Sequence, residues 1–279
     1  MTRLRSEDVA AGVNDLHAYD QELRRKTGTD LKGLACGAAG LEAETFDRLA
    51  VLATASAVPI TAGGGIIPGF SEAVRRTLAH IGLAAGVTDE ADVAGLAEAY
   101  RRRSELIFLA DDRCFVSIHT RRLTVISNAT ATGTGYAWGL GLMAGGLTGR
   151  PVLVIGCGPV GCSATETLLA LGARVHVFDV DRARACRLAA AMEAERFTVV
   201  VEEDFKAALA RHPLLLDATP AAGIIDADTL NPGSCISAPG VPLGLTAEAV
   251  AKASDRILHD FLEIGVATMA ALSLRSCER

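Results

Sequence analysis

Aromatic residues and positive charge are both scarce in this sequence of 279 residues. Phe, Trp and Tyr make up 4% of the chain, whereas half of the residues are hydrophobic. Burial must therefore rest on Ala, Val, Leu and Ile, which is typical of a parallel sheet covered by helices. Lys and Arg number 27 against 33 Asp and Glu, so the net charge is −6. This acidity argues against a protein that binds nucleic acid or an anionic membrane surface.

Several motifs that carry chemistry are also missing. The seven cysteines form no C-x-x-C pair, and none is followed by a histidine at metal-ligand spacing. This pattern predicts reduced thiols and no metal site. No G-x-S-x-G, H-E-x-x-H or Walker pattern occurs, and the six histidines show no pairing motif. The sequence therefore identifies no catalytic residue, and the chemistry is expected to come from a cofactor.

Segments that would enter a membrane are not apparent either. The opening residues, MTRLRSEDVA, contain no apolar h-region and predict no secretory signal. The stretch 123–149 carries no charge, but its many glycines and threonines do not suit a helix that faces lipid. We therefore expect a soluble, cytoplasmic protein in which this stretch is buried.

The second half of the chain has the more regular pattern. Short apolar strands alternate with helices after a turn-rich junction: strands at 152–155, 174–178, 197–201, 214–216 and 235–237, helices at 159–171 and 181–195. This alternation predicts parallel strands joined by right-handed crossovers, the doubly wound Rossmann architecture. The junction, 145–151, is rich in glycine, and we place the domain boundary within it, after residue 147.

The first half is predicted to be a mixed α/β, helix-rich domain. The expected elements are helices at 6–26, 41–57, 71–80 and 90–103, and strands at 59–61, 106–109, 115–119 and 123–126. Only Thr120, Arg121 and Arg122 separate the last two strands, which favours a hairpin.

A glycine-rich turn follows the strand at 152–155 and opens a helix. The first glycine of such a turn permits a sharp bend, the second lets a pyrophosphate approach the backbone, and the third lets helix and strand pack closely. Amides at the helix N-terminus then face the phosphates. We expect a dinucleotide to be bound by Gly156, Gly158, Pro159, Val160 and Gly161.

An acidic residue ends the next strand of this pattern. Asp179 follows Gly156 by 23 residues, since 179 − 156 = 23. A carboxylate at this place accepts hydrogen bonds from both ribose hydroxyls of adenosine and repels a 2′-phosphate. It therefore favours NAD over NADP, although Arg182 and Arg184 lie nearby.

Two later loops follow strands of the same sheet. In this fold the ligand lies beyond the carboxyl ends of the strands. We expect Thr219, Pro220 and Pro239, in these loops, to lie beside the nicotinamide half of the cofactor. The predicted organisation is an N-terminal substrate-binding domain at 1–147 and an NAD-binding Rossmann domain with a C-terminal helix at 148–279.

The first half offers three candidate substrate features, each with a structural alternative. The loop 61–70 contains three consecutive glycines, which indicates either a close backbone approach or a flexible connector. Asp111 follows an apolar strand and is either a counter-charge for a cationic substrate or a turn cap. Asn128 either orients a ligand or caps a helix.

Six stretches, taken in order, are far more specific than the glycine turn. They are residues 24–33, 65–67, 110–112, 218–220, 238–242 and 264–269. Together they resemble the family of pyrrolysine-forming dehydrogenases (PylD), and the resemblance extends over nearly the whole chain. The chain departs from the family pattern in the glycine-rich loop, where Ala62 and Gly64 stand in place of a small polar pair.

The resemblance implies an activity and a set of substrate contacts. The activity is NAD-dependent oxidation of lysine that carries an Nε-linked 3-methyl-D-ornithine, followed by loss of ammonia and closure of a pyrroline ring. The small-molecule substrate would be faced by Leu4, Phe70, Asp111 and Asn128. The alternatives are an NAD enzyme for another diamine or amino acid, and an NAD-binding sensor without catalysis. Because Rossmann enzymes often pair, we expect a homodimer.

Overall fold

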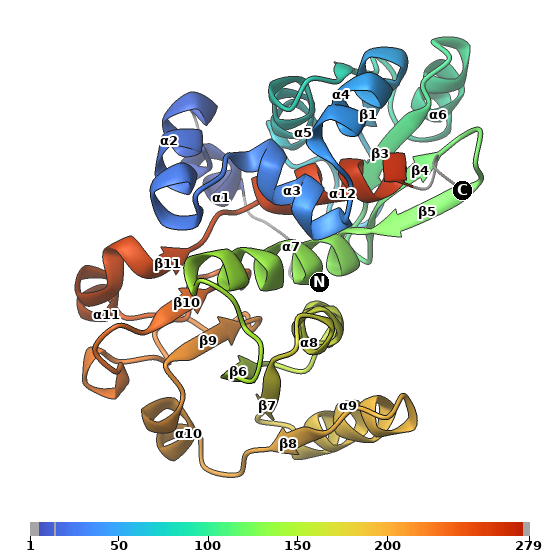
Figure 1. The fold of residues 1–279 in the computed structure, drawn as a ribbon. Coiled ribbons are helices and arrows are strands. Elements are labelled where there is room, and N and C mark those ends of the chain that lie inside the picture. Colours follow the sequence, from blue (N-terminus) through green and yellow to red (C-terminus); the bar gives the residue numbers. More distant parts are fainter. Residues whose placement is uncertain (1–5, 14, 276–279) are drawn as a thin grey trace. The chain divides into compact units, whose positions relative to one another are not determined.

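The computed structural model describes residues 6–13 and 15–275. The chain divides into two compact units. The first comprises Met1–Arg24, Thr29–Gly135 and Asp260–Arg279, and the second comprises Arg25–Gly28 and Tyr136–His259. Each unit is built on its own sheet (Figure 1). No helix in the described part of the chain has the length and apolar character needed to span a membrane.

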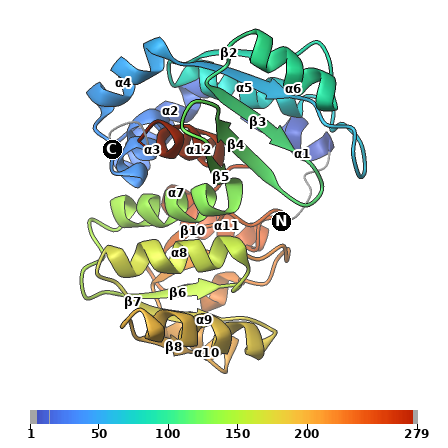
Figure 2. The same ribbon diagram turned by 90° about the vertical axis from the view of Figure 1, so that its right-hand side faces the viewer.

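The sheet of the first unit has five strands in the order β2-β1-β3-β4-β5, of which Figure 2 labels β2, β3, β4 and β5. They are β1 (Thr54–Val58), β2 (Ala84–Val87), β3 (Leu106–Ala110), β4 (Phe115–His119) and β5 (Thr124–Ser127). β1 pairs in parallel with β2 and β3, whereas β4 runs antiparallel to both β3 and β5. The predicted hairpin is therefore confirmed. β5 points the same way as β1, β2 and β3, so these four strands end at one edge of the sheet.

Helices precede and connect these strands. They are α1 (Ser6–Ala11), α2 (Leu16–Thr27), α3 (Leu31–Ala39), α4 (Ala43–Leu52), α5 (Phe70–His80) and α6 (Asp92–Arg101). The single helix expected at 6–26 is wrong, because two helices occupy this region. The strand expected at 59–61 is also wrong: the chain is already extended at 54–58, within the expected helix 41–57. The alanines of this strand favour a helix locally, but the sheet buries them.

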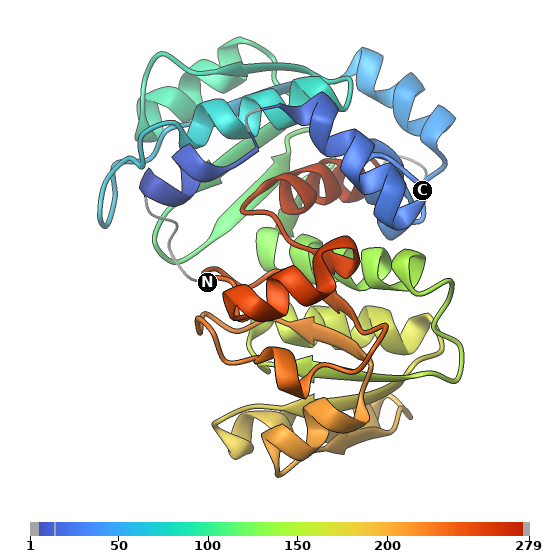
Figure 3. The same ribbon diagram turned by 90° about the vertical axis from the view of Figure 1, so that its left-hand side faces the viewer.

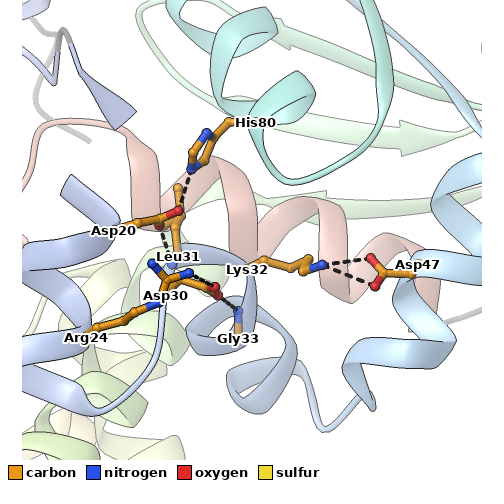
Figure 4. Close-up of polar contacts among 8 residues, drawn as sticks. All are labelled: Asp20, Arg24, Asp30, Leu31, Lys32, Gly33, Asp47 and His80. Carbon is orange, nitrogen blue, oxygen red and sulfur yellow. Dashed lines mark hydrogen bonds and ion pairs between the residues drawn. The ribbon is translucent and has the colours of Figure 1, made fainter. Parts of the chain in front are cut away.

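The connection between α2 and α3 lies within one of the stretches that resemble PylD (Figure 4). Asp30 caps the N-terminus of α3, an interaction that contributes about 1 kcal/mol to helix stability. Its other carboxylate oxygen lies 2.6 Å from the Arg24 guanidinium. Asp20, on α2, accepts from the Leu31 amide at 2.9 Å and lies 2.8 Å from the His80 ring. This stretch thus fixes the helix junction.

The C-terminal helix α12 (Glu263–Arg275) belongs to the first unit, where residues 263–274 are all buried. It packs against α3 and α5 and against the strands β4 and β5. The uncharged stretch forms α7 (Asn128–Met143), and the division between the units falls within this helix. The two compact units therefore divide at Gly135, earlier than residue 147. The C-terminal helix belongs to the first unit, because the apolar surface of this helix is buried there.

The second unit has a six-stranded sheet in the order β11-β10-β9-β6-β7-β8. The strands are β6 (Pro151–Ile155), β7 (Arg174–Phe178), β8 (Val199–Val201), β9 (Leu214–Asp217), β10 (Cys235–Ser237) and β11 (Ile257–Leu258). Every neighbouring pair is parallel. The order reverses beside β6, which confirms the predicted doubly wound Rossmann sheet.

Helices cover both faces of this sheet (Figure 3). They are α8 (Pro159–Ala170), α9 (Arg182–Ala194), α10 (Phe205–Arg211) and α11 (Ala247–Ala253), with short 3-10 turns at Ala227–Thr229 and Ser254–Arg256. Side chains of β6 alternate between the two apolar layers: Val152 and Val154 face one, Leu153 and Ile155 the other. Each buried side chain of this kind contributes about 1.5–3 kcal/mol.

Candidate active site

The glycine turn after β6 has the geometry of a pyrophosphate site. Gly156 has a φ of +91°, which side chains rarely adopt. A Cβ on Gly161 would lie 1.9 Å from the Gly156 carbonyl oxygen, so helix and turn can only meet at a glycine. A Cβ on Gly158 would meet nothing within 4 Å. The backbone at Gly158 therefore has open space beside it, as a closely approaching phosphate requires.

The first turn of α8 supplies the amides for that space. Pro159 is the first helical residue, where its missing N–H costs no hydrogen bond. The first bond within the helix runs from the Cys162 amide to the Gly158 carbonyl at 2.9 Å. The amides of Val160 and Gly161 precede it and lie at the positive end of the helix dipole. These donors fit an anionic pyrophosphate.

Cys157, within the same turn, is not a reactive thiol. Its side chain is buried, and burial raises the pKa of the thiol to about 12. The thiolate that would be the nucleophile is therefore absent at neutral pH. Cys157 instead contributes its amide, which donates to Asp179 Oδ2 at 2.7 Å.

An open cleft of about 330 Å³ lies at the carboxyl ends of β7 and β8. It is lined by Phe178, Asp179, Val180, Arg182, Glu202 and Glu203. Three of these six residues are acidic. Two nearby arginines could favour NADP, but each is paired with an acid. Arg182 pairs with Glu203, and Arg184 lies 3.4 Å from Asp181. The cleft therefore offers carboxylate acceptors and no uncompensated cation among the residues that line it.

The loops after β9 and β10 are joined through Asp217, the last residue of β9. Its Oδ1 accepts from the amide of Thr219 at 3.0 Å and from the hydroxyl of Thr219 at 2.8 Å. Its main-chain oxygen accepts from the amide of Gly240 at 3.1 Å. The structure thus places Thr219 and Pro220 in one loop and Pro239 in the other, both at the carboxyl edge of the sheet.

Asp217 itself was not singled out from the sequence. It has no exposed surface, and its Oδ2 has no hydrogen-bond partner among the described residues. Burial raises its pKa to about 6, against the lowering effect of the hydrogen bonds from Thr219. The only signal in the sequence is an acid at the end of an otherwise apolar strand, which does not reveal burial.

In the first unit, the glycine-rich loop is held against the turn between β3 and β4. The Gly64 amide donates to Asp112 Oδ2 at 2.7 Å. Gly63 has a φ of +70°, and a Cβ there would lie 2.1 Å from the same carboxylate. The Thr61 amide donates to Asp92 at 2.7 Å. The loop is therefore anchored at two points and is more than a loose connector.

Asp111 follows β3 and closes the turn that leads to β4. Its Oδ1 accepts from the amides of Arg113 and Cys114, each at 2.8 Å. These backbone hydrogen bonds, that from Cys114 foremost, lower the pKa of the carboxyl. Asp111 is therefore a turn cap and also an ionised carboxylate, so the two alternatives open in the sequence are compatible.

The other predicted substrate residues of this unit begin helices. Phe70 is the first residue of α5, and its ring packs edge-on against Phe115 with centroids 5.3 Å apart. Asn128 begins α7 directly after β5, and a Cβ on Gly265 of α12 would lie 2.8 Å from its Oδ1. Leu4 lies outside the described residues. Asp111 and Asn128 follow parallel strands, so they share one edge of the sheet.

A pair of buried acids at the start of α12 also escaped prediction. Asp260 accepts from the Tyr19 hydroxyl at 2.6 Å, and both Asp260 and Glu263 are almost fully buried. Burial, and next the charge of Asp260, raises the pKa of Glu263. The amide of Val13, just after α1, also hydrogen bonds to Glu263. These acids therefore connect α2, and the segment that follows α1, to the buried C-terminal helix.

A second cluster joins two histidines that are far apart in the sequence. His176 Nδ1 and His212 Nε2 lie 2.8 Å and 3.1 Å from the same oxygen of Glu202. Arg211 pairs with the other oxygen of Glu202. The three side chains are close enough to hold a metal ion, but Glu202 already has cationic and hydrogen-bond partners. We describe the cluster as a polar network that ties α10 to β7 and β8.

Two family models match the chain and together extend over most of it. The model of the pyrrolysine biosynthesis protein PylD, N-terminal domain, matches residues 8–126. The model of the alanine dehydrogenase/PNT C-terminal domain matches residues 125–225. A pyrrolysine synthase of Methanosarcina acetivorans is 28% identical over 269 residues, which cover 96% of this chain and 98% of that protein.

Solved structures of two dehydrogenases align with this fold. Shikimate dehydrogenase of Aquifex aeolicus aligns with a TM-score of 0.54 at 14% identity, covering 82% of this chain and 98% of that one. Quinate dehydrogenase of Corynebacterium glutamicum, in complex with NAD, gives a TM-score of 0.54 at 15% identity, covering 80% and 93%. At these identities the likeness shows the fold alone.

The Rossmann sheet, its glycine turn and the matched dehydrogenase domain define the class of protein: this is a dehydrogenase that binds a dinucleotide. Within that class, the chain is similar to the pyrrolysine biosynthesis protein PylD over the matched N-terminal domain and to a pyrrolysine synthase over nearly its whole length.

Proposed function

We propose that the enzyme oxidises the terminal amine of lysine-Nε-3-methyl-D-ornithine with NAD and thereby forms pyrrolysine. The substrate is chosen on the family and on its relatives named pyrrolysine synthase. The observation that carries the redox chemistry is the glycine turn, with open space at Gly158 and the Asp179 carboxylate at the end of the next strand.

The choice of NAD over NADP is supported by charge. A 2′-phosphate in the cleft at the end of β7 would meet the Asp179 carboxylate, whereas Glu202 and Glu203 are paired with Arg211 and Arg182. Arg182, the cation that lines the cleft, is already paired with Glu203. Like charges at short range disfavour binding, whereas ribose hydroxyls donate readily to a carboxylate.

The residues of the second unit would hold the cofactor along the sheet edge. Asp179 would accept from the adenosine ribose, and the amides of Val160 and Gly161 would donate to the pyrophosphate. The loops that contain Thr219 and Pro239 would lie beside the nicotinamide half. The bound cofactor supplies a hydride acceptor, which no side chain of the protein can replace.

The residues of the first unit would recognise the substrate. Asp111 would stay ionised and attract an ammonium group of a substrate that carries several. Phe70 would offer an apolar surface to the methylene chain, and Asn128 would exchange hydrogen bonds with a polar group. Leu4 is assigned to the same substrate by the family pattern. We accordingly assign substrate binding to the N-terminal half and cofactor binding to the Rossmann sheet.

The reaction conserves atoms without added water. A neutral terminal amine loses a hydride from its carbon and a proton from its nitrogen, leaving an imine. The α-amine of the methylornithine attacks that carbon, and the original nitrogen leaves as ammonia, which closes the pyrroline ring. Burial of the substrate amine assists the first step, because desolvation lowers the pKa of an ammonium group.

The assay combines the full-length enzyme with NAD and the synthetic isopeptide. We expect stoichiometric NADH by absorbance and a product with the mass of pyrrolysine. NADH formation with another diamine or amino acid, but not with the isopeptide, would show that the substrate is wrong and that the protein is still an NAD-dependent dehydrogenase. Binding of NAD without turnover of any amine would favour a sensor, and absence of NAD binding would overturn the proposal.

A further inference from the structure

Asp217 connects both loops that are expected to enclose the nicotinamide half of the cofactor. Its Oδ1 holds the amide and hydroxyl of Thr219, and its main-chain oxygen holds Gly240. On the other side, a Cβ on Gly244 would lie 1.9 Å from Oδ2. The carboxyl of Asp217 therefore holds the loop at 218–221 and packs against Gly244, while the main-chain oxygen of the same residue holds Gly240.

The unused oxygen of Asp217 indicates a role other than stability. A buried polar atom without a hydrogen bond costs about 1–3 kcal/mol. Asp217 Oδ2 is such an atom within the described residues, although an apolar residue of similar size would avoid this cost. Buried groups that are kept at such a cost are found at functional sites.

The contacts of Thr219 show what the carboxyl does. The Thr219 hydroxyl donates its one proton to Asp217, while the Ala221 amide approaches the same oxygen weakly, at 3.4 Å. To a ligand this oxygen would therefore offer a lone pair and no proton. Thr219 also lies against the glycine turn, since a Cβ on Gly156 would be 3.0 Å from its Cγ2. It is half-buried, so the residue is partly accessible to a ligand.

We propose that Asp217 is a positioning residue for the nicotinamide half of the cofactor. Its carboxylate accepts the hydroxyl proton of Thr219, so Thr219 Oγ1 can act only as an acceptor for O–H or N–H donors of the nicotinamide riboside. It also fixes the spacing of the two loops around that half. This inference rests on the proposed function, because it requires that a nicotinamide dinucleotide binds along this edge.

The test compares ligands that do and do not reach the two loops. ADP carries the adenosine half alone, whereas NAD carries both halves. For Asp217→Ala we expect NAD to bind about tenfold more weakly, the effect of one or two lost hydrogen bonds, with ADP affinity within about twofold of the native value. Asp217→Asn keeps an oxygen for Thr219 and should restore NAD affinity to within about threefold.

Two further variants separate positioning from a general loss of structure. Asp204→Ala removes a carboxylate that also accepts from a backbone amide, that of Ala207, but in the N-cap of α10. It should leave the affinities for NAD and ADP unchanged. Thr219→Val should weaken NAD binding. In the Thr219→Val background, the further change Asp217→Ala should lower NAD affinity by less than it does in the native chain, since both changes act through one hydroxyl.

The outcomes distinguish this inference from the proposed function. If native enzyme binds neither NAD nor ADP, the proposed function fails. If native enzyme binds both, and Asp217→Ala retains native NAD affinity or loses ADP and NAD equally, the positioning role is overturned. If the loss of NAD affinity in the double variant equals the sum of the losses in the two single variants, action through Thr219 is likewise contradicted.

Discussion

The main-chain amide of Cys157 donates to Asp179 Oδ2 at 2.7 Å, so the glycine turn and the acid that follows β7 are joined directly. The second oxygen, Oδ1, accepts from the amide of Asp181 at 2.8 Å. The carboxylate is thereby held in one orientation at the cleft beside β7. An oriented acceptor loses less freedom when a ribose binds, which favours affinity.

Replacing this carboxylate should change the preference between cofactors. In Asp179→Asn the negative charge that opposes a 2′-phosphate is gone, while the side chain keeps its size. We expect the ratio of NAD to NADP affinity to fall about tenfold, the effect of one like-charge contact. Titration of both cofactors checks this. Asp228→Asn removes the same charge from an exposed site and should leave the ratio unaltered.

Replacing each of two glycines in one turn by alanine should affect different properties: stability for Gly161 and NAD binding for Gly158. In Gly161→Ala the new Cβ would meet the Gly156 oxygen at 1.9 Å, so the free energy of unfolding should fall by about 1–3 kcal/mol. In Gly158→Ala the Cβ meets no protein atom within 4 Å. Its melting temperature should stay close to native while NAD binding weakens. Native NAD affinity in Gly158→Ala would contradict a close approach of the pyrophosphate.

Asp111→Asn should weaken substrate recognition without altering cofactor binding. The Asn side chain keeps an oxygen that can accept the hydrogen bonds of the turn, so any loss of activity reports the removal of the negative charge. We expect kcat/KM for the isopeptide to fall about tenfold or more, as for other desolvated charge pairs, with the KM for NAD unchanged. Asp112→Asn is the matched control, because it tests the contact with the Gly64 amide instead. Unchanged turnover in Asp111→Asn would remove Asp111 from the substrate site.

The buried acid Glu263 should make stability fall as pH rises. Its pKa is raised above the ordinary value of 4.5 in the folded chain, so the folded state keeps a proton that the unfolded state releases. The stabilising effect is complete below about pH 4.5 and is lost as pH rises toward the folded pKa. Denaturant unfolding at several pH values should show this slope. Glu263→Gln should flatten it, whereas Glu44→Gln, at an exposed position, should not.

The doubly wound sheet and its glycine turn could be predicted from short segments of sequence. The run at 152–155 is apolar on both faces, and the glycines that follow have roles that depend on neighbours within a few residues. Asp179 could be placed because a strand ends at Phe178. Such features are encoded by local periodicity and turn chemistry.

Elements whose state depends on distant partners could not be predicted in this way. The strand at 54–58 is rich in alanine and looks helical locally, but it pairs with β2 and β3. The C-terminal helix could be recognised as a helix, yet its burial against α3 decides the unit to which it belongs. These outcomes depend on long-range packing, which outweighs local propensity.

The sequence by itself determined the class of sheet, the glycine turn after β6 and the place of Asp179 after β7, because each rests on residues adjacent in the chain. Only the tertiary structure decided that Asp217 is buried beside Gly244, that His176 and His212 share Glu202, and that Asp111 caps a turn while remaining ionised. Burial and hydrogen bonding set the charge and orientation of a side chain, and both are properties of the folded surroundings.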